Sequence, residues 1–347
     1  MFIHNLRNFK NPGYFYLLAL TVLLRVIPII QFSTKQEVII FEPYIRSLLP
    51  ISLGFLSTPW INLSLAGMLV YFQAVLFNQI LIKYNIFPKP SYIPAAVYIV
   101  ISSLFTIFLT LQPVLIANFF VLWLFERLFS IYKTDQPISR AFDLGLIIAC
   151  GTFVYFPFII VLPIIWLALS IYFPFSWRSW VSGLMGFLIL YFFVGVYFFL
   201  SNNLDRFLFI FKPLNFTNPT YLPIIGDELW TLVPLAILLI LGIYFYRLNS
   251  AKNLILVRKS LQLLVFLTVL SGAGYYLQPV AMQNMGFAFT FQTRHTLLHF
   301  LIWAAPISVY LSYYFIFAKK RWIYESCFLT LFFTILFFQI YNGSILK

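Results

Sequence analysis

Long runs of apolar residues, separated by short polar stretches, make up most of this 347-residue chain. A helix needs roughly 20 mostly apolar residues to cross the hydrocarbon of a bilayer. Eleven runs of about this length predict membrane-spanning helices at 14–32, 61–82, 91–110, 113–131, 141–157, 158–174, 178–200, 229–246, 259–278, 295–317 and 322–341. The predicted fold class is therefore an all-α, polytopic transmembrane helical bundle that forms one domain over 1–347, with 229–341 as its C-terminal helices.

Basic residues fall almost entirely in alternate gaps between these runs. Of the 22 Lys and Arg residues, fifteen lie on one side, six on the other, and Arg25 lies inside the first run. Because cytoplasmic loops are enriched in Lys and Arg, the basic side is predicted to be cytoplasmic. The N-terminus is then cytoplasmic and the C-terminus outside. The same rule leaves 141–174 open, since its turn at Pro157 suits either two crossings or a re-entrant hairpin whose ends are both cytoplasmic.

Composition supports a membrane protein. The chain is 62% hydrophobic and 9% charged, and its mean hydropathy of +0.95 implies more apolar surface than one soluble core can bury. The net charge of +13 is scattered over helix ends and forms no stripe or patch of the kind that nucleic-acid binding needs. The expected partners are the lipid bilayer and its anionic headgroups, and other membrane proteins, but no nucleic acid.

Small residues at helical spacing predict faces where helices pack closely. They are Gly145, Ala149 and Gly151 in one run, Gly183 and Gly186 in another, and Gly272 and Gly274 in a third.

The first outer loop, 33–60, is long enough to hold structure. Glu42-Pro43 is typical of a helix start, Arg46 would lie opposite apolar residues, and Pro50 would end the helix. This pattern predicts a short helix lying in the membrane interface.

The carboxylates divide into two groups by side. Those near the inner face lie beside basic residues and are predicted to be interfacial ion pairs and anchors: Glu126, Asp135, Asp143 and Glu325. The outer group consists of Glu37, Glu42, Asp205, Asp227 and Glu228.

Arg294, His295 and His299 open the tenth predicted span on the outer side. A helix start with an arginine and two imidazoles on one face can receive a phosphate. The same histidines would bind a metal only with a third ligand from another loop, and an interfacial cluster that contacts headgroups is a further alternative. No metal site is predicted, and no cofactor beyond an optional divalent cation.

Arg25 is the intramembrane charge, roughly 10 Å from the end of the first span at 1.5 Å per residue. It would either extend outward to the interface or face an internal cavity. The chain lacks a phosphate-binding glycine loop, a dinucleotide fingerprint, a cysteine metal site and a nucleophile elbow. Nucleotide-driven and redox chemistry are therefore not expected.

Glu37 and Glu42 follow the first span in an outward loop, ahead of the predicted interfacial helix. This arrangement resembles the opening module of the GT-C superfamily of polytopic glycosyltransferases. The hairpin from Gly145 to Pro157, followed by a helix and Phe175-Ser-Trp-Arg-Ser-Trp180, is similar to short hairpins in those enzymes and in uncharacterised bacterial inner-membrane proteins. The resemblance covers 1–200. The first loop is short for that superfamily and lacks its usual aspartate.

The resemblance implies transfer of a sugar from a polyprenyl-phosphate donor at the outer leaflet of a bacterial cytoplasmic membrane. Glu37 and Glu42 would be the candidate base or metal positions. Arg25, Arg46, Arg294, His295 and His299 are the candidate phosphate or headgroup contacts. The alternatives are a non-catalytic subunit or scaffold of a cell-envelope complex and, third, a transporter.

Overall fold

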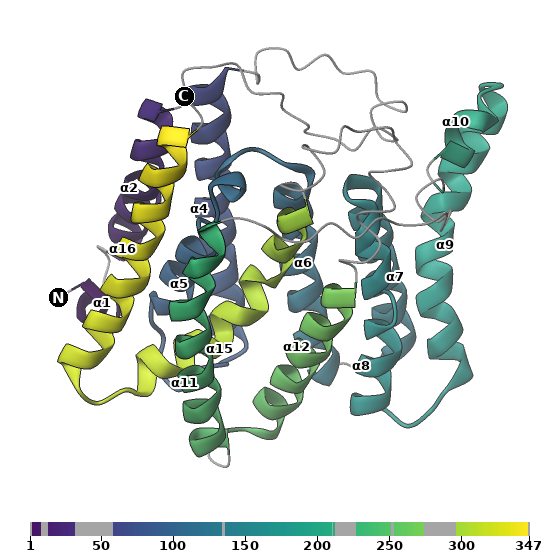
Figure 1. The fold of residues 1–347 in the computed structure, drawn as a ribbon. Coiled ribbons are helices and arrows are strands. Elements are labelled where there is room, and N and C mark those ends of the chain that lie inside the picture. Colours follow the sequence, from purple (N-terminus) through teal and green to yellow (C-terminus); the bar gives the residue numbers. More distant parts are fainter. Residues whose placement is uncertain are drawn as a thin grey trace.

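The described part of the chain is a bundle of helices (Figure 1). A computed structural model describes residues 2–7, 13–31, 58–133, 136–209, 211, 227–250, 253–273 and 296–345. No strand occurs within these ranges. The all-α prediction is confirmed for them. The predicted interfacial helix of the 33–60 loop lies almost entirely outside them.

The first half of the bundle contains α1 (Phe2–Arg7), α2 (Gly13–Gln31), α4 (Pro59–Lys83), α5 (Ile93–Ile101), α6 (Pro113–Ser130), α7 (Pro137–Val154), α8 (Ile164–Tyr172) and α9 (Trp177–Leu200). The second half contains α10 (Leu204–Phe209), α11 (Leu232–Ser250), α12 (Ile255–Ala273), α15 (Ala304–Phe317) and α16 (Arg321–Ile345). Short 3-10 helices connect or extend them: η2 (Thr106–Leu109), η3 (Ile131–Lys133), η4 (Phe156–Val161), η6 (Asp227–Thr231) and η8 (Thr296–Trp303).

Nine helical stretches within the described ranges are long and apolar enough to cross a membrane. They coincide with nine predicted spans to within a few residues; for example, 178–200 is Trp177–Leu200 and 61–82 is Pro59–Lys83. Large apolar side chains also point away from the bundle, and Phe15 and Ile30 are each 77% exposed. An apolar outer surface of this extent needs lipid to cover it. The chain is a multi-pass membrane protein.

The closest helix crossing lies between α7 and α9. A methyl group added at Gly145 would come within 2.8 Å of the backbone nitrogen of Phe187, and one added at Gly186 within 2.9 Å of the carbonyl carbon of Phe142. Backbones approach this closely only where a side chain is missing. The predicted packing faces at Gly145, Gly183 and Gly186 are confirmed. Gly272 packs against Trp303, whereas Gly274 lies outside the described residues.

The predicted span 91–110 is not one helix. α5 ends at Ile101, and the chain turns through Ser102 and Ser103 before the 3-10 helix η2 begins at Thr106. Polar side chains from other helices bond the backbone groups that this break frees. The Nε2 of Gln339 donates to the carbonyl of Ser103 (3.4 Å), and the Oδ1 of Asn62 accepts from the Leu111 amide (2.8 Å). A break of this kind is tolerated inside a membrane protein where other parts of the bundle form hydrogen bonds with its backbone N–H and C=O groups.

The predicted span 158–174 is also divided, into the 3-10 helix η4 and the nine-residue α8. Pro157 stands at the start of η4, and Pro163 is the residue before α8. Neither proline can donate a backbone hydrogen bond, so an unbroken α-helix through both is unfavourable. α8 packs against α9 and α12.

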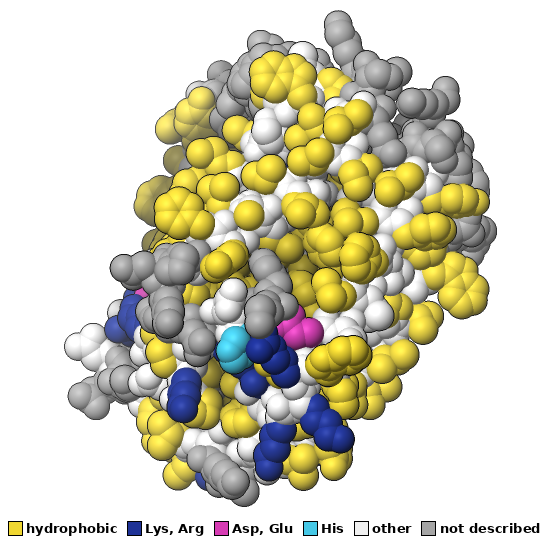
Figure 2. All heavy atoms as spheres, turned by 90° about the vertical axis from the view of Figure 1, so that its left-hand side faces the viewer, with side chains coloured by type: hydrophobic (Ala, Val, Ile, Leu, Met, Phe, Trp, Pro, Cys, Tyr) yellow, Lys and Arg dark blue, Asp and Glu magenta, His cyan; other side chains and the backbone are white. Residues whose placement is uncertain are grey.

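Charged side chains gather at one end of the bundle. In Figure 2, hydrophobic side chains cover most of the face that carries α2 and α16, and Lys and Arg side chains gather toward its lower part. Arg7 donates to the carbonyls of Phe315 (2.9 Å), Ile316 (2.6 Å) and Ala318 (2.7 Å) at the end of α15. A cation is favourable there because the last carbonyls of a helix carry partial negative charge.

Three of the four carboxylates predicted to lie near the inner face make ion pairs or helix-end contacts. Glu126 pairs with Lys83 at 2.5 Å, and Asp143 lies 3.7 Å from Arg127. Glu325 accepts hydrogen bonds from backbone amides of α1. Asp135 lies outside the described residues.

Candidate functional site

Two of the seven predicted site residues fall within the described ranges, Arg25 on α2 and His299 on η8. The others lie outside them: Glu37, Glu42, Arg46, Arg294 and His295. Their predicted roles stay predictions. The geometry of the candidate site is therefore built outward from Arg25.

Arg25 turns into the bundle. Its residue is 2% exposed, although α2 carries highly exposed apolar side chains on its other face. The side chain packs against the backbone of α4 at Gly67, where an added methyl would lie 2.7 Å from Cδ and 2.9 Å from Nε of Arg25. Of the two predicted alternatives, extension outward to the interface or facing an internal cavity, the side chain does not extend outward, because it lies buried against α4.

Within the described ranges, the guanidinium of Arg25 has no hydrogen-bonding or ion-pair partner. Its Nε, Nη1 and Nη2 atoms are buried, and none makes a hydrogen bond. The three ion pairs between described side chains involve other cations. A buried charge without a partner is strongly destabilising, by several kcal/mol in proteins. A planar guanidinium with its donors free is suited to a carboxylate or phosphate held bidentately.

Arg25 stands at the level of the break after α5. α2 and α5 run in the same direction and start side by side (Figure 1). The rings of Tyr14, at the start of α2, and Tyr92, just before α5, lie 5.0 Å apart. Arg25 is roughly 17 Å further along α2 than Tyr14 at 1.5 Å per residue, and the same rise from Tyr92 reaches residue 103. The charge and the broken backbone thus lie at roughly one depth in the bundle.

Further buried polar atoms in this part of the bundle make no hydrogen bond within the described ranges. They are the Ser103 hydroxyl and the side-chain carbonyl oxygens of Gln112 and Gln339. Buried polar groups are normally satisfied by protein or ordered water. A group of such acceptors with a hydroxyl at the break therefore favours a hydrated or ligand-binding interior at this depth.

A hydrogen-bonded polar layer beneath the break joins three helices and η8. Gln73 donates to the Leu115 carbonyl (2.7 Å) and accepts from the Tyr98 hydroxyl (2.9 Å). Asn118 donates to the carbonyl of Leu301 (3.2 Å). The sequence analysis did not single out these residues. The available signal was a polar side chain inside an apolar run, as at Asn62 and Gln73, which lie three helical turns apart on α4.

His299 is fully buried and bonded at both ring nitrogens. Its Nδ1 lies 2.8 Å from the Tyr155 hydroxyl, and its Nε2 contacts the carbonyl of Ser271. A carbonyl only accepts, so Nε2 carries the proton and the Tyr155 hydroxyl donates to Nδ1. Neither nitrogen is free for a phosphate or metal in this arrangement. The predicted shared face with His295 assumed an α-helix, whereas Thr296–Trp303 is a 3-10 helix.

The described residues contain no group of three or more His, Cys, Asp or Glu side chains able to hold a metal ion. Comparison of the chain with protein-family models, curated proteins and solved structures gives no match. The functional interpretation therefore depends on the chain's own residues, with Arg25 as the best-defined group.

Proposed function

We propose that this is a multi-pass protein of a bacterial cytoplasmic membrane that binds a polyprenyl-linked phosphate and transfers the attached sugar at the outer leaflet. The chain would cross eleven times, nine times as long helices and twice as the divided pairs α5–η2 and η4–α8. The basic end of the bundle would face the cytoplasm, with the N-terminus inside and the C-terminus outside. The alternation of basic gaps along the chain supports this orientation.

In the proposed reaction Glu37 or Glu42 accepts the proton of the acceptor hydroxyl, and Arg25 binds the phosphate of the donor. Arg46, Arg294 and His295 would supply further contacts to the leaving phosphate as its charge develops. A preorganised cation assists transfer when it lies where negative charge increases in the transition state.

The observation that carries the proposal is the buried guanidinium of Arg25, which has no partner among the side chains and backbone groups that the structure describes. It lies six residues before the end of α2 at Gln31, roughly 9 Å along the helix at 1.5 Å per residue. A charge at such depth is costly, and ionisable groups inside membrane helices are typically functional. A phosphate is the anion that a lipid-linked donor would bring there.

The test uses Arg25→Met in a strain that lacks the endogenous protein, with surface glycans as the readout. Thr21→Val is the matched control, because Thr21 lies one turn away on α2, is buried, and bonds only to the Leu17 carbonyl. We expect Arg25→Met to abolish complementation while the purified variant is as stable as the parent or more so, since an unpaired charge is removed. Thr21→Val should complement fully.

Full complementation by Arg25→Met would refute the phosphate-binding role. A marked loss of stability in that variant would refute it too, since it would show that Arg25 has a structural counter-ion.

The non-catalytic alternative makes a different prediction. A scaffold would be recovered with a partner in fixed stoichiometry, as native mass spectrometry of the purified protein can show. Recovery of such a partner, together with normal surface glycans in the deletion strain, would favour the scaffold over the transferase.

A further inference from the structure

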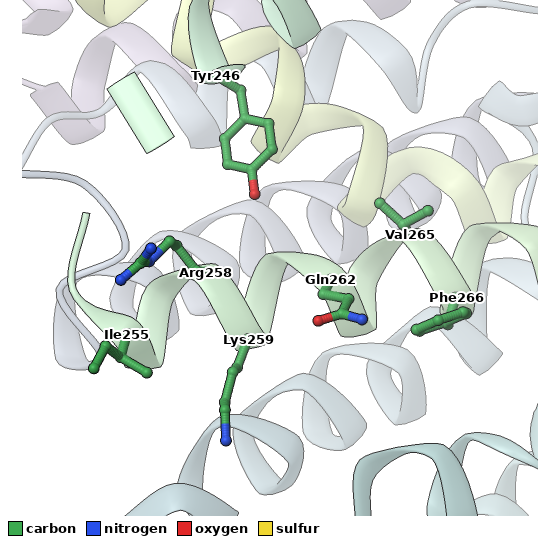
Figure 3. Close-up of a pocket in the computed structure, with 7 residues that line it drawn as sticks. All are labelled: Tyr246, Ile255, Arg258, Lys259, Gln262, Val265 and Phe266. Atoms are coloured by element: carbon green, nitrogen blue, oxygen red, sulfur yellow. The ribbon is translucent and has the colours of Figure 1, made fainter. Parts of the chain in front are cut away.

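A separate pocket of about 670 Å³ lies between α11 and α12 (Figure 3). Tyr246 comes from α11 and the remaining lining residues come from α12: Ile255, Arg258, Lys259, Gln262, Val265 and Phe266. This volume is within the ~300–1,000 Å³ range of small-molecule sites. None of these residues belongs to the candidate site around Arg25.

The pocket is polar at one end and apolar at the other. Four of the lining residues lie near one face of α12 because of their spacing. They are Arg258, then Gln262 four residues later, Val265 three residues after that, and Phe266 next to it. Figure 3 shows Arg258 and Lys259 near the start of α12 with their side chains directed to opposite sides of the helix, Gln262 further along, Val265 and Phe266 further still, and the Tyr246 hydroxyl directed at the middle of α12. A phosphate headgroup followed by an acyl chain has the same order of polarity.

The cations of this pocket lack carboxylate partners. Arg258 makes no ion pair within the described part of the chain, and Lys259 is held by the Ile171 carbonyl at 2.8 Å and lies 5.5 Å from the Tyr172 ring centre. The first turn of α12 holds no acidic residue. A helix start carries partial positive charge and normally favours acids, so cations here are unfavourable unless an anion binds. The partial positive charge at the start of α12 and the guanidinium of Arg258 together attract a phosphate.

We infer that the pocket between α11 and α12 binds an anionic phospholipid, with its headgroup phosphate at Arg258 and an acyl chain along Val265 and Phe266. Ile255 and Val265 are 56% and 45% exposed, so an acyl chain can lie along this face of α12. A phospholipid would cover these side chains and neutralise Arg258 at once. Basic pockets between membrane helices on the cytoplasmic side are typical sites for anionic lipid headgroups.

The test measures lipid retention by the full-length protein in mild detergent, using native mass spectrometry with phosphatidylglycerol or phosphatidylcholine of the same chain length. We expect retention of phosphatidylglycerol over phosphatidylcholine. Arg258→Gln should weaken the binding of phosphatidylglycerol about five-fold, which corresponds to ~1 kcal/mol per cation at a membrane surface. Arg258→Lys should retain most of the preference, because it keeps the charge.

Lys320→Gln is the matched control, since it removes the same charge from an exposed position in the turn before α16. It should leave retention unchanged. Equal retention of the two lipids, or equal effects of Arg258→Gln and Lys320→Gln, would overturn the inference. Displacement of the lipid by glycerol phosphate at equal concentration would overturn it as well, because it would show that the apolar half of the pocket contributes nothing.

Discussion

Replacing Gly186 by alanine should separate α7 from α9. The added methyl would lie 2.9 Å from the carbonyl carbon of Phe142 and 3.0 Å from its Cα, whereas carbon atoms normally pack at about 3.5–4.0 Å. Both atoms belong to the backbone of α7, which cannot move aside as a side chain does. The helices must therefore part by about 0.5–1 Å.

The expected cost of Gly186→Ala follows from the effect of overpacking a well-packed interior, about 1–3 kcal/mol of unfolding free energy. Gly195→Ala is the matched control on the same helix. There the nearest atom is the tip of the Phe207 ring at 3.2 Å, so the ring can give way. Alanine also favours a helix over glycine by about 1 kcal/mol. We expect the control to be neutral or slightly more stable.

Both variants can be measured by reversible denaturation in mixed micelles, with tryptophan fluorescence as the signal. Gly186→Ala should unfold at lower denaturant than the parent, and Gly195→Ala at the same or higher denaturant. Equal midpoints for the two variants would contradict the close crossing of α7 and α9. A loss of stability in Gly195→Ala alone would contradict it equally.

Three further predictions concern buried and exposed polar groups. Gly67→Ala should displace the Arg25 side chain and so lower complementation. The free energy of unfolding should change by less than ~1 kcal/mol, because the Arg25 side chain can shift. Normal surface glycans in this variant would contradict the prediction. His299→Phe should destabilise by about 2–4 kcal/mol, because it removes the buried hydrogen bonds that the imidazole makes with the Tyr155 hydroxyl and the Ser271 carbonyl; a thermal midpoint equal to that of the parent would exclude the two-bond arrangement. Lys83→Met should change stability by less than ~1 kcal/mol, because its ion pair is exposed, and a larger shift in the same thermal assay would show that the pair is part of a wider network.

The candidate site could be predicted from the sequence only in part. Arg25 stands out in any hydropathy profile, because a lone charge in an apolar run is rare. The profile does not show which way the Arg25 side chain points. Whether a residue faces lipid or the bundle depends on which helices pack around its own helix. The packing of Arg25 against Gly67 depends on how α2 meets α4. For His299, sequence spacing predicted a phosphate contact, whereas Tyr155 and Ser271, distant in the chain, occupy both ring nitrogens.

The sequence alone determined the helical class, the membrane environment, most span limits and the glycine faces of α7 and α9. These features depend on properties that are local to the chain: run length, polarity and the absence of a side chain at a helical repeat. Only the tertiary structure decided where the predicted span 91–110 breaks. Apolar composition favours a continuous helix there, and the break is stable because Asn62 and Gln339 bring hydrogen bonds from distant helices. Backbone groups inside a membrane protein must find partners, and which partners are within reach is a property of the assembled bundle.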